Sequence, residues 1–577
     1  MPCHPLQTFK LSTVRPFILS AGLAFATLAS PSLAASEASA ASYAPPDQGL
    51  GNVHMATSCK PESGAKFDRA LALLHNFWYA RALRAFDEVS ATDPQCAMAY
   101  WGAAMTYNHP VWDAPTAADE AAAWAYVRKG LAATERSPRE QMYLDAVAAL
   151  FKDGGIGKKA DRDNAYADAM AAAYAKYPDV ETTLFDALAI YGSIPEGAKG
   201  FEKIDRAEAL LKNVYAVDPT HPGILHYLIH VNDDPIHAEQ GLPAARAYAT
   251  SAAAVPHAQH MPSHIFTRLG LWSESALTNE NAWRTSEADV KRAGESGAYR
   301  DFHSLNYMQY AYLESGRFKD AKRATDIIAK QYAETADKTT APDTPLLEAR
   351  HVRGRTIYAQ PDRVAYGYFD MLTRYIVETK DWAEADSIPL VAPSRDFKAM
   401  KLQIQTMAAA RRGDTVAARG YADAIATLAM EPNQQPFAAQ IIAMQAKEAA
   451  ASAAAAAGDR RKALDFMNDA IGIENSIDSL SQPPYPIVPA NELLGDMLLA
   501  MHEPADAEAH YLAALKRTPG RPMSIYGIAQ AAQQLGDKPT ATKYFSSFLA
   551  LWKQADPGLP QVAAARQFLT TAKAESR

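Results

Sequence analysis

Small residues, aromatic residues and prolines recur at fixed offsets along this chain, and this recurrence limits its fold more than any other feature. Near the C-terminus the recurring positions are Gly495, Ala507 and Tyr511 and, thirty-four residues later, Ala529, Ala541 and Phe545. Small side chains let two antiparallel helices pack closely, and Pro519 follows the second helix because proline cannot continue it. Apolar residues also recur at i, i+3, i+4 and i+7, the period of an amphipathic helix. We therefore expect an all-α protein of repeated helix–turn–helix units.

The same frame recurs in earlier segments of the chain. The residues that mark it are Ala82, Phe86 and Pro94; Ala207, Leu211 and Pro219; Ala244, Tyr248 and Pro256; Gly316 and Ala321; Gly413 and Ala418; and Gly458 and Ala463. In this order and spacing the chain resembles the tetratricopeptide (TPR) repeat proteins over most of its length. The resemblance implies an all-α, TPR-type helical-repeat solenoid, a right-handed superhelix of antiparallel helix pairs with a concave groove.

The N-terminus has the pattern of a secretory signal peptide. Lys10 and Arg15 precede the apolar run "FILSAGLAFATLA", and "SLA" at 32–34 offers small residues for cleavage. A membrane anchor is the alternative, but the apolar run is short for a span. We expect a periplasmic or secreted protein with no integral membrane segment after signal cleavage. The predicted organisation is a signal peptide at 1–34, a flexible segment at 35–50, an N-terminal TPR-like array at 51–330, an irregular helical connection at 331–400 and a C-terminal TPR array at 401–577.

Cysteine usage agrees with export. Cys3 would leave with the signal peptide, so the mature chain would keep only Cys59 and Cys96. An even pair in an exported protein predicts one disulfide, which would stabilise the fold by about 3–4 kcal/mol in the chain-entropy model. Two unrelated buried thiols are the alternative.

Histidines are concentrated in one part of the predicted array. The TPR resemblance implies that the first helix of each unit lines the groove, and its frame places His226 and His230 on one such helix, His260 and His264 on the next, and His303 on a third. Each of the two pairs is spaced i,i+4, so its members share one helical face. Two such pairs on neighbouring helices can converge on one ion, with His303 as a fifth ligand or as a group that holds substrate. The predicted cofactor is a divalent or transition metal, either copper, zinc or iron.

Other side chains near these histidines suit catalysis. Asp233 and Asp234 are candidates for a base, a ligand or a group that orients a histidine, and Tyr227 and Tyr310 are candidate proton donors, with Tyr307 nearby. A metal would polarise a substrate or generate a bound hydroxide, so an oxidase, an oxygenase or a hydrolase is expected. A metal-free pocket with a catalytic histidine, metal storage or delivery, and a plain polar groove wall are the alternatives.

Further groove positions complete the candidate binding residues. They are His75, His109, Met98, Trp101, Met105, Asn306 and Arg268. Thioethers beside imidazoles would favour copper, although methionine and tryptophan at helical spacing more often form core. The frame places His221, His237 and His257 in turns at helix ends, where capping is expected, and the last two could also orient a ligand.

Longer segments carry a narrower resemblance. "TSCKPESGAKFDRALALLHNFWY", "DPQCAMAYWGAAM", "HYLIHVNDDP" and "HAQHMPSHIFTRLGLW" are similar to a group of secreted bacterial TPR-domain proteins, which implies fold and export but no reaction. The TPR family implies a peptide or partner helix in the groove. Expected partners are therefore a small-molecule or peptide ligand, or an envelope protein bound by a non-catalytic scaffold.

Some function classes have no support in the sequence. A net charge of −8 and the absence of any Lys/Arg-rich block argue against a nucleic-acid partner. The chain contains no G-x-x-x-x-G-K-[ST], G-x-G-x-x-G or H-E-x-x-H motif, and no C-x-x-C-H. Nucleotide binding, zincin proteolysis and covalent haem are therefore not expected.

Overall fold

A computed structural model describes residues 48–577 except 112–113, 196–199, 336–349, 353–354, 358–362, 390–393, 433–435, 478–486 and 576–577. The predicted signal peptide, most of the segment at 35–50 and much of the connection at 331–400 thus lie outside the described residues. No helix in the described part of the chain is long and apolar enough to cross a membrane.

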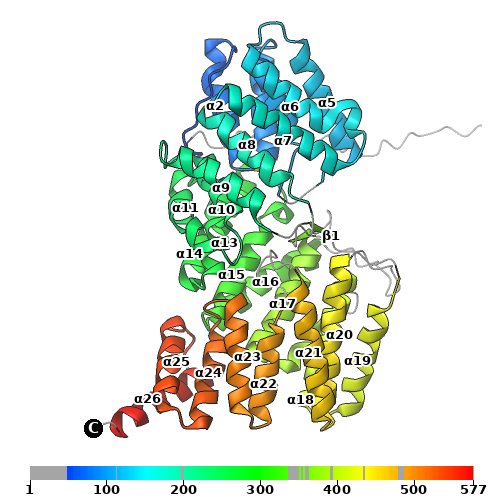
Figure 1. Ribbon diagram of the computed structural model, residues 1–577, viewed down its shortest axis with the longest axis vertical. Coiled ribbons are helices and arrows are strands. Elements are labelled where there is room, and N and C mark those ends of the chain that lie inside the picture. Colours follow the sequence, from blue (N-terminus) through cyan, green and yellow to red (C-terminus); the bar gives the residue numbers. More distant parts are fainter. Residues whose placement is uncertain are drawn as a thin grey trace, which may run out of the picture. The chain divides into compact units, whose positions relative to one another are not determined.

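Helices follow one another along the chain and pack as antiparallel neighbours (Figure 1). The N-terminal helices are α2 (Pro61–His75), α3 (Tyr79–Thr92), α4 (Ala97–Met105), α5 (Ala117–Ala132), α6 (Pro138–Gly155), α7 (Lys159–Lys176), α8 (Val180–Gly192), α9 (Glu202–Tyr215), α10 (Pro222–Val231), α11 (Ala238–Ser251), α12 (Pro256–His260), α13 (Pro262–Arg268), α14 (Trp272–Ala293), α15 (Phe302–Glu314) and α16 (Phe318–Thr335). The later helices are α17 (Arg363–Thr379), α18 (Arg395–Arg411), α19 (Thr415–Ala429), α20 (Pro436–Ala456), α21 (Arg460–Ser476), α22 (Ala490–Ala500), α23 (Pro504–Arg517), α24 (Pro522–Leu535), α25 (Lys538–Leu551) and α26 (Pro560–Glu575).

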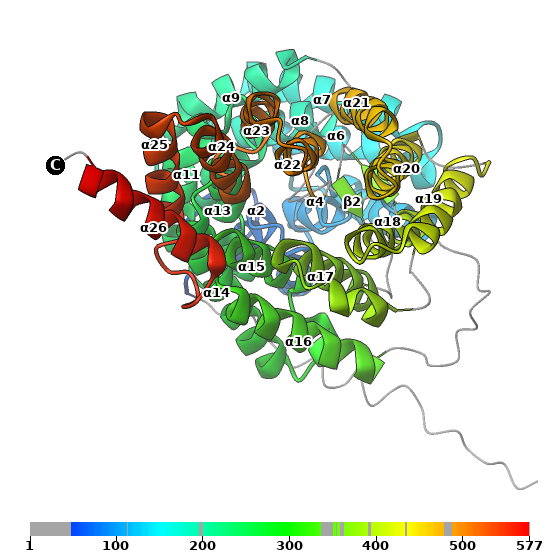
Figure 2. The same ribbon diagram turned by 90° about the horizontal axis from the view of Figure 1, so that it is seen from below.

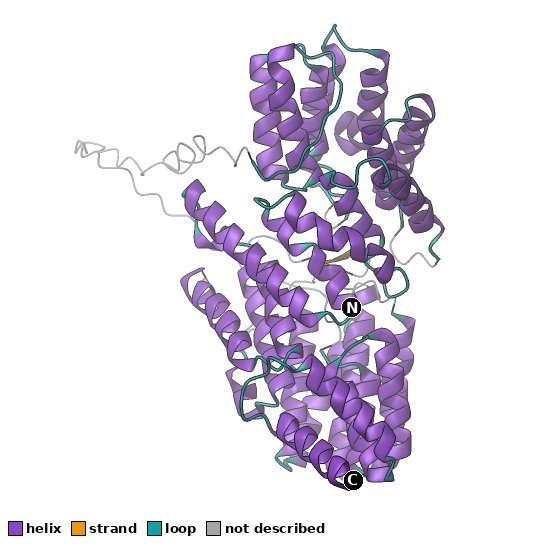
Figure 3. Ribbon diagram, turned by 90° about the vertical axis from the view of Figure 1, so that its left-hand side faces the viewer, coloured by secondary structure: helices purple, strands orange, loops and turns teal. Residues whose placement is uncertain are grey.

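Short elements interrupt this order in three places. The 3₁₀ helices are η1 (Gly297–Tyr299) and η2 (Trp382–Ser387), and the strands β1 (Arg350–Val352) and β2 (Arg355–Ile357) form an antiparallel hairpin in which Arg350 pairs with Ile357. Figure 3 shows how completely helices dominate the rest of the described chain. The predicted connection at 331–400 thus contains a hairpin and also α17, which packs against both α16 and α18.

Local sequence signals set where the helices begin and end. Thr116 and Ser137 cap α5 and α6 with complete capping boxes. The side-chain oxygen of each accepts from a backbone N–H in the first turn, and the backbone N–H of each donates to the carboxylate of the same first-turn residue. Proline at the first helical position starts α10 and α24, among others, because it has no N–H to leave unsatisfied. Gly294 and Gly536 end α14 and α24 in the left-handed conformation, which glycine adopts without strain.

The repeat positions predicted from spacing are positions at which neighbouring helices pack together in the structure. The alanines at these positions are all buried: Ala82, Ala207, Ala244, Ala321, Ala418, Ala463, Ala507, Ala529 and Ala541. Figure 2 shows the resulting close approach of neighbouring helices, for example in the row from α18 to α21. The prediction of an all-α, TPR-type helical-repeat solenoid is therefore confirmed.

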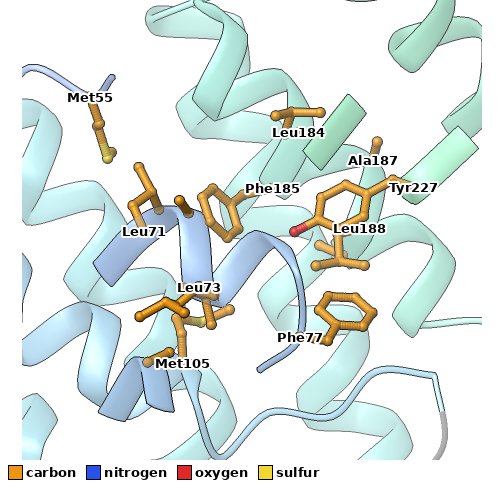
Figure 4. Packing of buried hydrophobic residues seen from close by; sticks show 14 of the residues in the cluster. Met55, Leu71, Leu73, Phe77, Met105, Leu184, Phe185, Ala187, Leu188 and Tyr227 are labelled. Carbon is orange, nitrogen blue, oxygen red and sulfur yellow. The ribbon is translucent and has the colours of Figure 1, made fainter. Parts of the chain in front are cut away.

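The core of the N-terminal array is rich in aromatic rings (Figure 4). Trp101 on α4 packs edge-on against Tyr143 and Phe185, with ring centroids 5.2 and 4.9 Å away. The predicted disulfide between Cys59 and Cys96 is present, and it joins the chain just before α2 to the residue that caps α4. Both features hold the first helix pairs together.

A buried ionic cluster joins helices that are far apart in sequence. Arg521, directly before α24, donates to Glu314 of α15, Glu378 of α17 and Glu492 of α22. Burial raises the pKa of Glu314 to about 8. The negative charges of Glu378 and Glu492 add to this effect, and the guanidinium of Arg521 opposes it. Glu314 therefore keeps its proton at neutral pH.

Close packing around Tyr511 predicts opposite effects for two glycine substitutions. A Cβ at Gly527 would overlap the Tyr511 ring, whereas a Cβ at Gly472, on the exposed face of α21, meets nothing within 4 Å. We expect Gly527→Ala to lower the free energy of unfolding by about 1–3 kcal/mol through overpacking. Gly472→Ala should raise it by about 0.5–1 kcal/mol through helix propensity. Urea unfolding followed by circular dichroism measures both, and equal shifts would contradict the packing argument.

The protonated Glu314 predicts a loss of stability with rising pH. The folded state holds this proton up to about pH 8, while the unfolded carboxyl loses it near its ordinary value of 4.5. The free energy of unfolding should thus fall between about pH 4.5 and 8, by up to ~1.4 kcal/mol per pH unit from this group. Glu314→Gln should flatten this part of the profile, because an amide has no proton to release. An unchanged slope in the variant would show that another group titrates.

Candidate metal centre

Three histidines from α10 and α12 form a first triad. His226 and His230 are one turn apart on α10 and both are buried, and the half-buried His257 comes from α12. The Nε2 atom of His226 lies 3.0 Å from that of His230 and 3.1 Å from that of His257. One ligand atom from each of the three residues lies within 4.8 Å of the other two. The first triad therefore points three ring nitrogens at one small volume.

Three more histidines form a second triad. His260 ends α12, His264 lies one turn further on in α13, and both are buried, while His303 on α15 is exposed. The Nε2 atoms of His260 and His264 are 3.0 Å apart, and the rings of His260 and His303 have centroids 4.6 Å apart. Again one ligand atom from each residue lies within 4.8 Å of the others.

The predicted ligands form two separate groups in the structure, whereas the sequence predicted a single group. The sequence placed His226, His230, His260 and His264 around one ion, but each pair belongs to its own triad. The sequence predicted His257 in a turn at a helix start or end, with a capping or orienting role; it lies in the first turn of α12, and its Nε2 is within 3.1 Å of that of His226. Helix α12 begins at Pro256, so His257 is already helical and lies one turn before His260.

Hydrogen bonds at Nδ1 fix the orientation of three of these rings. His226 donates to the backbone carbonyl of His75 over 2.6 Å, His260 to Oδ1 of Asn279 over 2.7 Å, and His264 to Asp233 over 2.8 Å. The Asn279 amide is itself oriented, because its nitrogen donates to the Ser275 carbonyl. A carbonyl or carboxylate oxygen only accepts, so Nδ1 carries the proton in all three rings and Nε2 of each neutral ring presents a lone pair.

Lone pairs that converge in this way call for a cation between them. In the second triad, Nε2 of His260 and Nε2 of His264 face each other at 3.0 Å, with both Nδ1 protons already used. In the first triad, the single lone pair at Nε2 of His226 faces Nε2 of both His230 and His257. A shared proton would satisfy one pair of nitrogens, whereas a metal ion satisfies a whole triad. Two nitrogens on one tetrahedral ion lie about 3.3 Å apart, close to the spacing seen here.

The electrostatic environment keeps two rings of the first triad, those of His226 and His257, neutral. Burial holds the pKa of His226 at about 3, against the opposing effect of its bond to the His75 carbonyl. Burial also places the pKa of His257 well below its ordinary value, and the neighbouring histidines add to the effect. Imidazole binds a metal only when it is neutral, so both rings are ready ligands at neutral pH.

Aromatic rings enclose the triads. Phe77 has its ring centroid 4.3 Å from that of His226 and 5.6 Å from that of His230, and Tyr248 stacks on the other side of His226 at 5.1 Å. Phe77 adopts a positive φ of 53°, an uncommon conformation for an aromatic residue. Tyr307, one turn after His303, packs on His260, His264 and His303 with centroids 4.8 to 5.0 Å away. The rings limit access of water to the buried histidines.

A third group, made of His75, Glu181 and His221, is a complete hydrogen-bond network. His75 donates from Nε2 to Glu181 over 2.8 Å and accepts at Nδ1 from the hydroxyl of Tyr227 over 2.9 Å. His221 accepts at Nδ1 from the Gly223 amide and donates from Nε2 to the other Glu181 oxygen over 3.2 Å. The two histidines hold the pKa of Glu181 at about 2 although burial opposes this. Since donors and acceptors match here, the group needs no ion.

Two predicted catalytic aspartates have separate roles. Asp233 orients His264 and forms an ion pair with the predicted binding residue Arg268 over 3.0 Å. Asp234 instead accepts from the backbone amides of Ile236 and His237 and from the His237 ring. The prediction of Asp234 as a base at the metal was therefore wrong, because its carboxylate shapes the turn before α11.

Tyr227 and Tyr310 do not serve the triads as proton donors. Tyr227 follows His226 directly and so points to another side of α10, where it bonds His75 (Figure 4 shows it beside Phe77). Tyr310 lies next to Glu314 and the Arg521 cluster, and burial raises its pKa well above the ordinary value. Tyr307, on the same face of α15 as His303, instead contacts all three histidines of the second triad.

The remaining predicted binding residues lie away from both triads. Asn306 donates to Asp370 and accepts from Arg374, both on α17. His109 bonds the carbonyl of Thr106 and stacks on a tyrosine ring at 4.2 Å. The three predicted wall residues of α4 are core residues instead: Met98, Trp101 and Met105. Their helix is covered by neighbouring helices, so the prediction of a thioether wall beside the imidazoles was wrong.

Comparisons with known proteins give no closer assignment. No protein-family model and no curated protein matches the chain. Among solved structures, the human IFIT1 dimer with PPP-AAAA has 12% identity and a TM-score of 0.34, and covers 76% of this chain and 88% of its own. The APC/C hetero-tetramer Cut9-Hcn1 has 11% identity and a TM-score of 0.29, and covers 89% of this chain and 76% of its own. These likenesses are too low to carry an argument, and the assignment of the fold rests on the helix pairs themselves.

The two adjacent aspartates provide a matched pair for testing the orienting bond. Asp233→Asn replaces the carboxylate that holds His264, so metal affinity at the second triad should fall by about 10–100-fold. Asp234→Asn keeps the oxygen that caps α11 and does not touch a triad, so affinity should stay unchanged. Titration of metal-free protein with Zn²⁺ against a chromophoric chelator measures both. Equal affinities in the two variants would show that Asp233 does not tune the site.

Proposed function

We propose that this chain is an exported TPR-repeat metalloprotein whose histidine triads hold copper, zinc or iron, and that it is a metal-dependent oxidoreductase or hydrolase. The observation that carries the proposal is the convergence of three ring nitrogens in each triad, together with the Nδ1 protons of His226, His260 and His264 that are donated to acceptors outside the triads. Elsewhere in proteins, imidazole ligands with a carboxylate or carbonyl behind them are the usual arrangement at metal sites.

The three imidazoles of each triad limit the kind of reaction that a bound ion could catalyse. Three imidazoles per ion leave at least one coordination position for water or substrate, as catalytic sites require. A bound ion there would polarise a substrate or lower the pKa of a bound water. The ring of Tyr307 would limit the access of water to an ion in the second triad, since it packs on all three of its histidines with centroids 4.8 to 5.0 Å away. The exposed His303 and the half-buried His257 mark the side from which a small molecule reaches the ions.

Localisation in the periplasm or outside the cell remains part of the proposal. The disulfide between Cys59 and Cys96 supports it, because such bonds form and persist in oxidising compartments. The signal-peptide pattern around Lys10 and Arg15 supports it independently.

A non-catalytic scaffold is the second candidate function. The TPR-type helical repeat supports a scaffold or interaction role, and helical-repeat proteins bind peptides or partner proteins along their stacked helices. On this alternative the histidines would be held by shared protons and would bind no metal, and the partner would be a peptide or an envelope protein.

Elemental analysis of protein purified without a His-tag separates the two candidates. The metalloprotein proposal predicts near-stoichiometric metal, which His230→Ala and His264→Ala each reduce while the helical circular-dichroism signal stays intact. His54→Ala is the matched control, because this side chain is exposed and lies outside both triads. Metal-free protein that also fails to bind Cu²⁺, Zn²⁺ or Fe²⁺ in titration would exclude the metalloprotein and leave the scaffold.

A further inference from the structure

We propose that the two triads form one dinuclear copper centre, in which both ions share a small bridging ligand such as hydroxide. This inference rests on the proposed function and adds to it the number of ions, their coupling and their identity.

One short helix supplies a ligand to each triad. His257 and His260 are three residues apart on α12, with ring centroids 6.2 Å apart, and they belong to the first and the second triad respectively. Residues at this spacing lie on one helical face with Cβ atoms about 5–6 Å apart. Two-metal sites hold their ions about 3.5–4 Å apart, a separation that neighbouring ligands on one helical turn can serve. The two triads therefore lie next to each other, because one turn of α12 carries a ligand of each.

Helix α10 and the residues just after it also contribute to both triads. It carries His226 and His230 of the first triad, and the chain just after its end supplies Asp233, which orients His264 of the second. Arg268 holds the other oxygen of that carboxylate. Helix α12 and the chain around α10 thus contribute to both triads, which links the positions of the two sets of ligands, as a shared bridging ligand requires.

The donor set favours copper. All six groups are imidazoles, and no carboxylate oxygen belongs to either triad among the described residues. Di-iron and di-manganese sites of helical proteins use bridging glutamates, and the nearest carboxylate here, Asp233, is committed to His264 and Arg268. For nitrogen ligands of this kind copper binds more tightly than the other divalent first-row metals, including zinc.

Copper titration with electron paramagnetic resonance (EPR) tests the inference. Metal-free full-length protein is titrated with Cu²⁺, and bound copper is measured by atomic absorption. Two bound ions per chain with almost no EPR signal are expected, because a bridging ligand couples the two unpaired spins. Acid denaturation of the same sample should release the full Cu²⁺ signal, which excludes reduction to Cu⁺ as the cause of the silence.

Variants of the outer ligands provide the decisive comparison. His303→Ala should lose the copper of the second triad and His257→Ala that of the first, and each should then show the EPR signal of one isolated Cu²⁺ ion. His54→Ala should behave as the unaltered chain. Zn²⁺ at equal concentration should not displace the bound copper.

Other outcomes overturn the inference in distinguishable ways. Two ions with a full EPR signal would mean two independent mononuclear sites, and one ion per chain would mean a single centre. Displacement by equimolar Zn²⁺ would overturn the assignment to copper alone. Each of these leaves the metalloprotein proposal standing, whereas the absence of any bound metal would remove both.

Discussion

A buried carboxylate anchors the part of the array that carries the histidines. Glu181 on α8 accepts from His75 at the end of α2 and from His221 at the start of α10, so one side chain joins three helices that are far apart in sequence. The His75 backbone carbonyl, held in place by this network, is the acceptor that orients His226. A charge at this depth is stable only because both of its oxygens are paired. The geometry of the first triad therefore depends on a network that does not itself bind an ion.

The two kinds of polar cluster in this region differ in one physical respect. Around Glu181, each N–H or O–H meets an acceptor, so the cluster is complete as it stands. In the triads, the protons of His226, His260 and His264 point outward to fixed acceptors and the lone pairs point inward. The first arrangement supplies rigidity, and the second supplies affinity for a positive charge. Such a division of roles is common where a site must be preorganised before its ligand arrives.

The fold and part of the site could be predicted from the sequence because both have a period. Small residues thirty-four positions apart gave the helix pairs, and the i,i+4 spacing of His226 and His230 gave a shared face. His257 was missed because the repeat frame ends its unit at proline, whereas the next helix starts there. Glu181 and Asn279 act through contacts between helices, which no local spacing encodes. Glu181 is one of two acidic residues in the segment "VETTLFDALAIYG", so nothing local marked it for this role.

Phe77 connects the backbone of one turn to the chemistry beside it. An L-residue in the left-handed region stores strain of order 1–3 kcal/mol, which the contacts of its side chain must offset. Here those contacts are with the rings of His226, His230 and His257, and with those of Tyr79 and Tyr227. A movement of these imidazole rings would weaken the contacts that stabilise the backbone at Phe77. A change in that backbone would in return remove the apolar Phe77 ring from the imidazoles. The turn between α2 and α3 and the rings of the first triad therefore hold each other in place.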